Sequence, residues 1–159
     1  MIDNEKRFEK DKEGKQIATV FFNNFGYSMT ATTDTFNRLD GAFMASGNVY
    51  GVEVKWLSND RYCKYDDIII AKNKYDYSIG KGKEESALTR TFKVDYTKVD
   101  NGIILFTTDF SNCEGLTPVW MLLPTGNYEG APKEWQMAYK VPRSRAKKWK
   151  ITDGKVEQI

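Results

Sequence analysis

Residues 40–55, DGAFMASGNVYGVEVK, decide the fold that we expect for this chain. The Ser-Gly-Asn run at residues 46–48 has the chemistry of a turn, and the sequence on both sides of it suits extended structure. We therefore predict strands over residues 35–45 and 49–57, joined as antiparallel neighbours. Because the turn sets which residues face each other, the register of this hairpin can be worked out from the sequence.

The predicted hairpin brings charged side chains together. Side chains alternate between the two faces of a strand, so in the second strand Glu53 and Lys55 point to the face opposite the one that Val52 and Val54 share. Asp40 and Glu53 are each about six residues from the turn, so they lie roughly opposite one another. Two carboxylates this close repel unless a cation is bound, and hard oxygen ligands select Mg²⁺, with Mn²⁺ as the alternative. A lysine on the same face can orient water or neutralise a phosphate, as metal-assisted phosphodiester hydrolysis requires.

Helices are predicted on both sides of the hairpin. Apolar spacing indicates a helix over residues 4–26 that stops at Gly26, followed by a weakly indicated short strand over 28–33. Residues 66–79 are predicted to form a second helix, in which Ile68, Lys72, Tyr75 and Ile79 line one stripe. The three consecutive isoleucines in this segment leave a strand as the competing interpretation.

The second half of the chain is predicted to be rich in strands. The Asp-Asn-Gly turn at residues 100–102 predicts a hairpin of strands 91–99 and 103–110. Residues 117–123, TPVWMLL, indicate a buried strand that places Trp120 in the core. Residues 134–141 suit a strand or a short helix. A last hairpin is expected around Asp153-Gly154, and Trp149 before it is expected to anchor the tail to the core.

Composition narrows the classes of function. The chain has 159 residues, which fits one domain over 1–159, and its formal net charge is only +2. It contains no histidine, so Ser-His-Asp catalysis, Cys-His catalysis and mixed cysteine–histidine zinc sites are excluded. Cys63 and Cys113 have no metal-ligand spacing; two free thiols are favoured, with one disulfide as the alternative.

The first sixteen residues, MIDNEKRFEKDKEGKQ, are highly charged and lack the apolar run of a signal peptide. No stretch approaches the roughly 18 consecutive apolar residues of a membrane span. We therefore expect a cytoplasmic protein with no membrane partner.

Asp40 together with Glu53-Val54-Lys55, within YGVEVK, resembles the motif of the PD-(D/E)xK, or restriction-endonuclease-like, nuclease superfamily. The expected order of elements is similar to the core of that family over residues 5–125, with additional strands in a basic C-terminal extension at 126–159. The residue before Asp40 is Leu39, where the family name has proline. The resemblance implies an α/β fold with an α-β-β-β-α-β core and Mg²⁺-dependent cleavage of nucleic-acid backbones.

The resemblance also implies roles for individual residues. Asp40 and Glu53 would be metal ligands, and Lys55 would position the nucleophile. Some members add a glutamate from the first helix, for which Glu13 is preferred over Glu9, and many add a polar residue from the second helix, for which Lys72 is the candidate. DNA is favoured over RNA as the substrate, endonuclease and exonuclease action both remain open, and a homodimer is expected from the family alone.

Basic residues could supply contacts to nucleic acid. Two of the candidates follow the Glu53–Lys55 strand and four lie in the C-terminal tail. They are Arg61, Lys64, Arg143, Arg145, Lys147 and Lys148. Solvated surface charge is the alternative interpretation of these residues.

Two other functions stay open on the sequence. The chain could be a catalytically inactive nuclease fold that binds nucleic acid without cutting it. It could also be a regulatory protein-binding module of a phage or mobile element. In that case Glu53 and Lys55 would be an ordinary pair of charges on an exposed strand.

Overall fold

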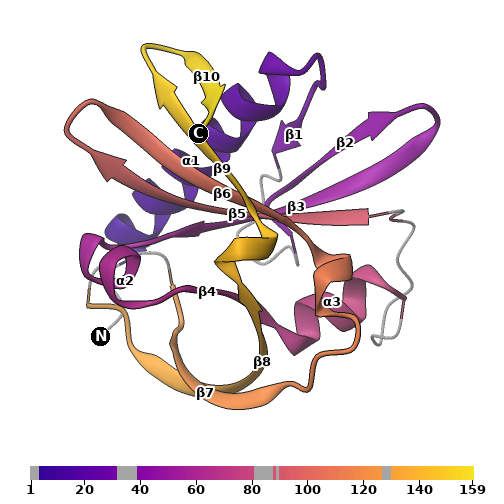
Figure 1. Ribbon diagram of the computed structural model, residues 1–159, viewed down its shortest axis with the longest axis vertical. Helices are drawn as coiled ribbons and strands as arrows, with labels where there is room; N and C mark the ends of the chain where they lie inside the picture. Colours follow the sequence, from indigo (N-terminus) through magenta and orange to yellow (C-terminus); the bar gives the residue numbers. More distant parts are fainter. Residues whose placement is uncertain (1–3, 32–38, 81–87, 89, 127–129) are drawn as a thin grey trace.

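The computed structural model describes residues 4–31, 39–80, 88, 90–126 and 130–159, and within them the chain is a mixed α/β fold with a curled, strand-rich sheet (Figure 1). A seven-stranded sheet has the order β1-β2-β3-β5-β6-β9-β10, and a three-stranded sheet has the order β4-β8-β7. The helices are α1 (Asn4–Asn24), α2 (Asn59–Lys64) and α3 (Lys72–Ser78), with short 3-10 turns η1 (Phe110–Cys113) and η2 (Arg143–Arg145). The strands are β1 (Thr30–Ala31), β2 (Gly41–Ala45), β3 (Asn48–Trp56), β4 (Asp67–Ala71), β5 (Arg90–Val99), β6 (Gly102–Asp109), β7 (Val119–Pro124), β8 (Lys133–Pro142), β9 (Lys147–Thr152) and β10 (Lys155–Gln158).

The first helix confirms the prediction for residues 4–26 and covers one face of the larger sheet. It ends at Asn24, two residues before the predicted stop at Gly26, whose positive φ of 84° lets the amide of Tyr27 donate to the carbonyl of Phe22 (3.1 Å). Its apolar side buries Ile17 and Phe21 against the sheet. Gly14, which looks like a weak point in the sequence, lies where a Cβ would be 3.0 Å from Val54, so it permits the close approach of helix and strand. The side chain of Phe8 and residues 32–38 of the predicted strands lie outside the described residues.

The hairpin of β2 and β3 is confirmed. Ser46 and Gly47 both have positive φ angles, 52° and 80°, and Ala45 pairs with Asn48, which is the geometry of a two-residue hairpin turn. The hairpins of β5 with β6 and of β9 with β10 are also confirmed. Trp149 anchors β9 as expected, because its ring packs edge-on against Phe21 of α1 and Phe25 just after that helix.

The prediction of one helix over residues 66–79 is wrong. Residues 67–71 form β4, and only Lys72–Ser78 form the helix α3. Ile68 and Ile70 are fully buried while Ile69 between them is less so, which is the period of a strand and not of a helix. Pairing with β8 satisfies the backbone groups on one side of β4, so the strand interpretation of the isoleucines is the correct one.

Between β3 and β5 the chain passes through α2, β4 and α3, and it returns so that β5 lies parallel to β3. This crossover aligns Glu53 with Lys93 and Lys55 with Asp95. Side chains on the other face of both strands, including Val54 and Tyr96, pack in the core with α1. The four charged side chains therefore point away from α1, toward the smaller sheet.

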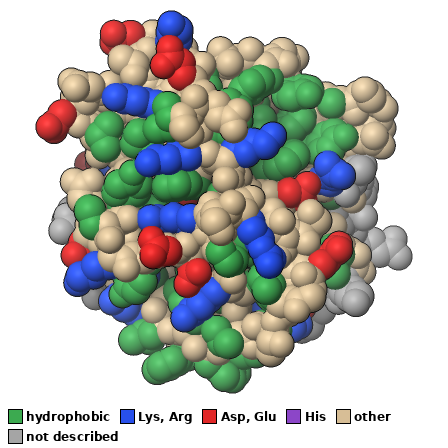
Figure 2. All heavy atoms as spheres, viewed as in Figure 1, with side chains coloured by type: hydrophobic (Ala, Val, Ile, Leu, Met, Phe, Trp, Pro, Cys, Tyr) green, Lys and Arg blue, Asp and Glu red, His purple; other side chains and the backbone are tan. Residues whose placement is uncertain are grey.

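The prediction that Trp120 belongs to the core is wrong. Its side chain is 66% exposed, because β7 is the edge strand of the smaller sheet and Trp120 lies on its outer face. Residues 134–141 resolve as the strand β8, in which Trp135 is also exposed. Figure 2 shows hydrophobic side chains along the lower edge of the molecule, where Figure 1 places β7 and β8. Cys63 and Cys113 are both free thiols, as expected.

Candidate active site

Asp40 stands one residue before β2, not within a strand as predicted, and is tied to β3 at two points. Its backbone amide donates to the carbonyl of Val52 (2.9 Å). Its Oδ2 accepts a hydrogen bond of 2.7 Å from the backbone amide of Val54. Since Gly41 pairs with Val52, the next position outward from the turn places Asp40 beside Glu53. The side chain of Asp40 thus occupies the place of a strand carbonyl and fixes its carboxylate against β3.

Glu53 is a largely buried carboxylate, with a side chain 20% exposed, and its Oε2 is fully enclosed. Burial, followed by the nearby negative charge of Asp40, raises its pKa to about 8. Its Oε2 accepts no hydrogen bond and lies 3.6 Å from the ammonium nitrogen of Lys74. A carboxylate oxygen in this condition gains from a bound cation, because the cation restores the solvation that burial removed.

The other two groups of the predicted motif are also perturbed by burial. Burial is the largest cause that raises the pKa of Asp40, to about 6; the Val54 hydrogen bond opposes the shift and the charge of Asp11 on α1 adds to it. Burial lowers the pKa of Lys55 to about 8, and the positive charges of Lys93 and Arg61 lower it further. Titratable groups whose pKa values are shifted this far by their surroundings are concentrated at functional sites.

Two residues that sequence reasoning missed complete the charged face. Lys93 and Asp95 on β5 form an ion pair of 3.0 Å, with side chains only 6% and 3% exposed. The Lys93 ammonium also donates to the backbone carbonyl of Ile69, which links β5 to β4 across the two sheets. No local pattern in the sequence indicates that Lys93 and Asp95 belong to the site, because only the parallel pairing of β3 with β5 places them beside Glu53 and Lys55.

Lys72 does not take the place that the resemblance implies. Its ammonium pairs with Asp76 of the same helix at 2.5 Å, which raises the pKa of Lys72. The predicted stripe assumed a helix running from residue 66, whereas α3 begins at Lys72, so the helical phase differs. Lys74, two residues later, is the lysine of α3 that reaches Glu53.

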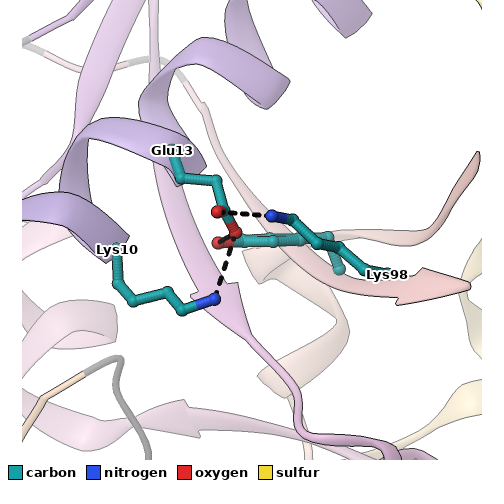
Figure 3. A network of polar contacts seen from close by, with 4 residues as sticks. Lys10, Glu13 and Lys98 are labelled. Atoms are coloured by element: carbon teal, nitrogen blue, oxygen red, sulfur yellow. Dashed lines mark hydrogen bonds and ion pairs between the residues drawn. The ribbon is translucent and has the colours of Figure 1, made fainter. Parts of the chain in front are cut away.

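Glu13 is committed to other partners on the α1 side. Its carboxylate accepts a hydrogen bond of 2.9 Å from the hydroxyl of Tyr96 and pairs with Lys98 at 2.7 Å and with Lys10 at 3.5 Å (Figure 3). Glu9 is exposed. The acidic residue of α1 whose charge acts on Asp40 is Asp11.

A cavity of about 390 Å³ lies between the two sheets, and we call it the site cavity. Its floor is the charged face of β3 and β5, and its opposite wall comes from β4, β7 and β8. The described residues that line it include six cations and four acids, which favours an anionic ligand. The cations are Lys55, Arg61, Lys74, Lys93, Lys140 and Arg143, and the acids are Glu53, Asp67, Asp95 and Glu134.

The six candidates for nucleic-acid contact divide into two groups. Arg61 and Arg143 line the site cavity. Arg143 is held there by a hydrogen bond to the carbonyl of Tyr62 (2.8 Å) and by stacking on Phe106 (4.7 Å to the ring centroid). The others are not among the lining residues. Lys64 pairs with Asp60, Lys148 lies over the Phe106 ring, and Arg145 and Lys147 are exposed.

The pair of Asp40 and Glu53 fits a Mg²⁺ ion by its donor chemistry. Among the described residues, no group of three or more acidic, cysteine or histidine side chains converges on one point. Proteins nevertheless hold Mg²⁺ with one or two carboxylates, and water and substrate phosphate supply the remaining oxygens. The buried Glu53 oxygen without a hydrogen bond is a further observation in favour of a cation.

Comparison of the chain with models of known protein families, with curated proteins and with solved structures finds no match. Within the part of the chain that the structure describes, none of the helices combines the length and apolar character that crossing a membrane requires.

Proposed function

We propose that this chain is a Mg²⁺-dependent nuclease that hydrolyses phosphodiester bonds, with DNA as the favoured substrate. The observation that carries the proposal is the closeness of Asp40 to Glu53 and Lys55: its carboxylate accepts the hydrogen bond of Val54, the residue between them, and its charge acts on Glu53. Glu53 and Lys55 line the site cavity, whereas Asp40 is not among the lining residues. The site cavity beside Glu53 and Lys55 has an excess of cationic residues, as a polyanionic substrate requires.

The arrangement of elements supports the same proposal. A helix, three antiparallel strands, a crossover that contains a helix, and a fourth strand parallel to the third follow in the order that the restriction-endonuclease-like core has. The chain departs from the simple form of that core by inserting β4 into the crossover and by adding the strands from β6 onward.

Each residue of the site has a distinct chemical task. Asp40 and Glu53 would hold the Mg²⁺ ion, which when bound polarises a phosphate oxygen and lowers the pKa of water. Glu53 must release its proton to serve as a ligand, so binding of the metal releases a proton near neutral pH. Lys55 orients the attacking water and offsets the charge that develops on the phosphate. Lys74, whose ammonium lies 3.6 Å from Glu53, holds a substrate phosphate oxygen and keeps the carboxylate in place.

Incubation of plasmid DNA and single-stranded DNA with the protein, in Mg²⁺ and in EDTA, tests the proposal. We expect cleavage in Mg²⁺ alone, and loss of cleavage in Glu53→Ala and Lys55→Ala. Lys72→Ala is the matched control, because Lys72 is a lysine near the site that pairs with Asp76 instead. Cleavage that the Glu53 variant retains at full rate would show a contaminating nuclease and remove the proposal. Binding of DNA without any cleavage would favour a nucleic-acid-binding protein with an inactive nuclease fold.

A further inference from the structure

The β7–β8 hairpin forms a second wall that faces the charged floor of the site cavity. Met121 pairs with Gln136 and Leu123 pairs with Glu134, so these side chains share one face of the hairpin, and all four line the site cavity. Trp120, adjacent to Met121, is 66% exposed and does not line it. The inner face of the hairpin therefore belongs to the site, whereas Trp120 and Trp135 on the outer face lie outside it; Leu122 and Pro124, also on the outer face, line the site cavity as well. We call the inner-face residues Met121, Leu123 and Gln136 the hairpin wall.

The hairpin wall is fixed in place. Strand β8 pairs with β4 along five residue positions, from Asp67–Pro142 to Ala71–Ala138. Strand β4 is linked in turn to the floor by the bond from Lys93 to the carbonyl of Ile69. The hairpin continues beyond β7, where the amide of Thr125 donates to the carbonyl of Pro132 (2.7 Å). A substrate must therefore fit into the space between the floor and the hairpin wall without movement of either.

The dimensions of this space decide which form of nucleic acid can reach Glu53. A cavity of 390 Å³ is near the lower end of the roughly 300–1,000 Å³ that small-molecule sites occupy, and one nucleotide is a ligand of that class. Double-stranded DNA, whose major groove alone is about 12 Å wide, is much larger than a space of 390 Å³, so an intact duplex cannot occupy the cavity. A base-paired nucleotide would enter only after unpairing, which costs free energy that a single strand does not spend.

The chemistry of the two walls also matches an unpaired nucleotide. Lys55 lies on the floor, and Arg61 of α2 and Lys74 of α3 also line the site cavity, so a phosphate would lie among these cations. Met121 and Leu123 oppose them with an apolar surface against which a base can pack. Tyr65, which lines the site cavity with a side chain 57% exposed, offers an aromatic ring for the neighbouring base to stack on.

We propose that the site cavity admits one unpaired nucleotide at a time, with its base against the hairpin wall, so that the enzyme cleaves single-stranded DNA, overhangs and flaps in preference to duplex. This inference rests on the proposed nuclease function and names its substrate class. It assigns a specificity role to Met121 and Gln136, residues of the second sheet that do not belong to the motif of Asp40, Glu53 and Lys55.

The test compares Mg²⁺-dependent cleavage of one end-labelled oligonucleotide as a single strand, as a blunt duplex and as a duplex with an overhang. We expect the single strand and the overhang to be cut at least about tenfold faster than internal bonds of the duplex, because unpairing costs the duplex more than 1.4 kcal/mol. Met121→Trp and Gln136→Trp, on different strands of the hairpin wall, fill the space and should reduce single-strand cleavage by about tenfold or more. Trp120→Ala, on the outer face, is the control and should leave it unchanged.

The outcomes separate this inference from the proposed function. Equal cleavage of single strand and duplex interior, abolished in both by Glu53→Ala, would overturn the single-strand preference and keep the nuclease. Full activity of both wall variants would equally overturn it. Should the wild type cut nothing, the nuclease proposal fails, and fluorescence anisotropy with the same labelled oligonucleotides then decides the preference. The inference is supported if the wild type binds the single strand more tightly than the duplex and if either wall variant weakens that single-strand binding. It is overturned if the wild type binds the duplex as tightly as the single strand, or more tightly.

Discussion

The backbone amide of Val54 donates a hydrogen bond of 2.7 Å to the carboxylate of Asp40. Val54 is the residue between Glu53 and Lys55, so this one bond fixes the acid that precedes β2 against the strand that carries the other two residues. It also opposes the rise in the pKa of Asp40 that burial causes.

Asp40→Asn and Asp40→Ala should differ in stability and agree in activity. The asparagine carbonyl can still accept the Val54 hydrogen bond, whereas alanine leaves that buried amide unsatisfied, at a cost of about 1–3 kcal/mol in the free energy of unfolding. Both variants lose the negative charge, so both should lower kcat by about 10²–10³-fold. Urea denaturation and cleavage rates measure the two effects, and equal stability of the two variants would contradict the structural role given to the bond.

Lys74 and Lys72 lie two residues apart on α3 and provide a matched pair. Lys74 approaches Glu53 at 3.6 Å and lines the site cavity, whereas Lys72 pairs with Asp76. Lys74→Ala should reduce cleavage by about tenfold or more, because a cation beside the substrate phosphate is lost. Lys72→Ala should stay within about twofold of the wild type, since a surface ion pair contributes about 0–1 kcal/mol. The reverse ranking would restore the sequence-based assignment of Lys72.

The stability of the metal-free protein should fall as the pH rises from about 4.5 to 8. The pKa of Glu53 is about 8 in the folded protein against an ordinary 4.5, and that of Asp40 is about 6 against 3.8. The folded state therefore binds more protons than the unfolded chain in this window, and the free energy of unfolding decreases with rising pH. Melting temperatures in EDTA should show this slope.

Two controls sharpen the pH experiment. Glu53→Gln removes the largest contribution and should flatten the slope. Saturating Mg²⁺ should stabilise the protein more at pH 8 than at pH 6, because the ion competes with protons for the carboxylates. A slope unchanged by either treatment would place its origin elsewhere in the protein.

The buried pair of Lys93 and Asp95 should matter for stability. Lys93→Met leaves Asp95 buried and unpaired and also removes the bond to the carbonyl of Ile69. Breaking a buried pair by removal of one partner costs about 3–5 kcal/mol. The double variant Lys93→Met/Asp95→Leu should recover a large part of that loss, because no uncompensated charge remains. Guanidinium denaturation measures both, and a single variant as stable as the wild type would contradict a buried ion pair at this position.

Predictions for the site succeeded where local geometry controls the outcome. The turn at Ser46-Gly47 sets the register of β2 with β3, which places Asp40 beside Glu53. Alternation along β3 puts Val52 and Val54 in the core and turns Glu53 and Lys55 to the other face. The nuclease assignment itself stays a proposal, since it depends on chemistry that the cleavage experiments must demonstrate.

Predictions failed where the structure of a segment depends on a residue or strand far away in the sequence. Residues 67–71 carry both helical and strand signals, and pairing with β8 about 70 residues later selects the strand. That choice moves the start of α3 and replaces Lys72 by Lys74 at the site. Trp120 satisfies every local criterion for a core residue but lies on the outer face of an edge strand.

By itself, the sequence determined the hairpins, the first helix and the side of β3 on which Glu53 and Lys55 lie, because turn chemistry and side-chain alternation act between neighbours in the chain. Only the tertiary structure decided that β5 returns parallel to β3 with Lys93 and Asp95 beside them, and that the β7–β8 hairpin closes over the same face. Parallel pairing and the packing of one sheet over another join residues far apart in sequence. These arrangements are stabilised by burial and by hydrogen bonds between distant residues, and such interactions produce no periodic pattern in the sequences of the segments that they join.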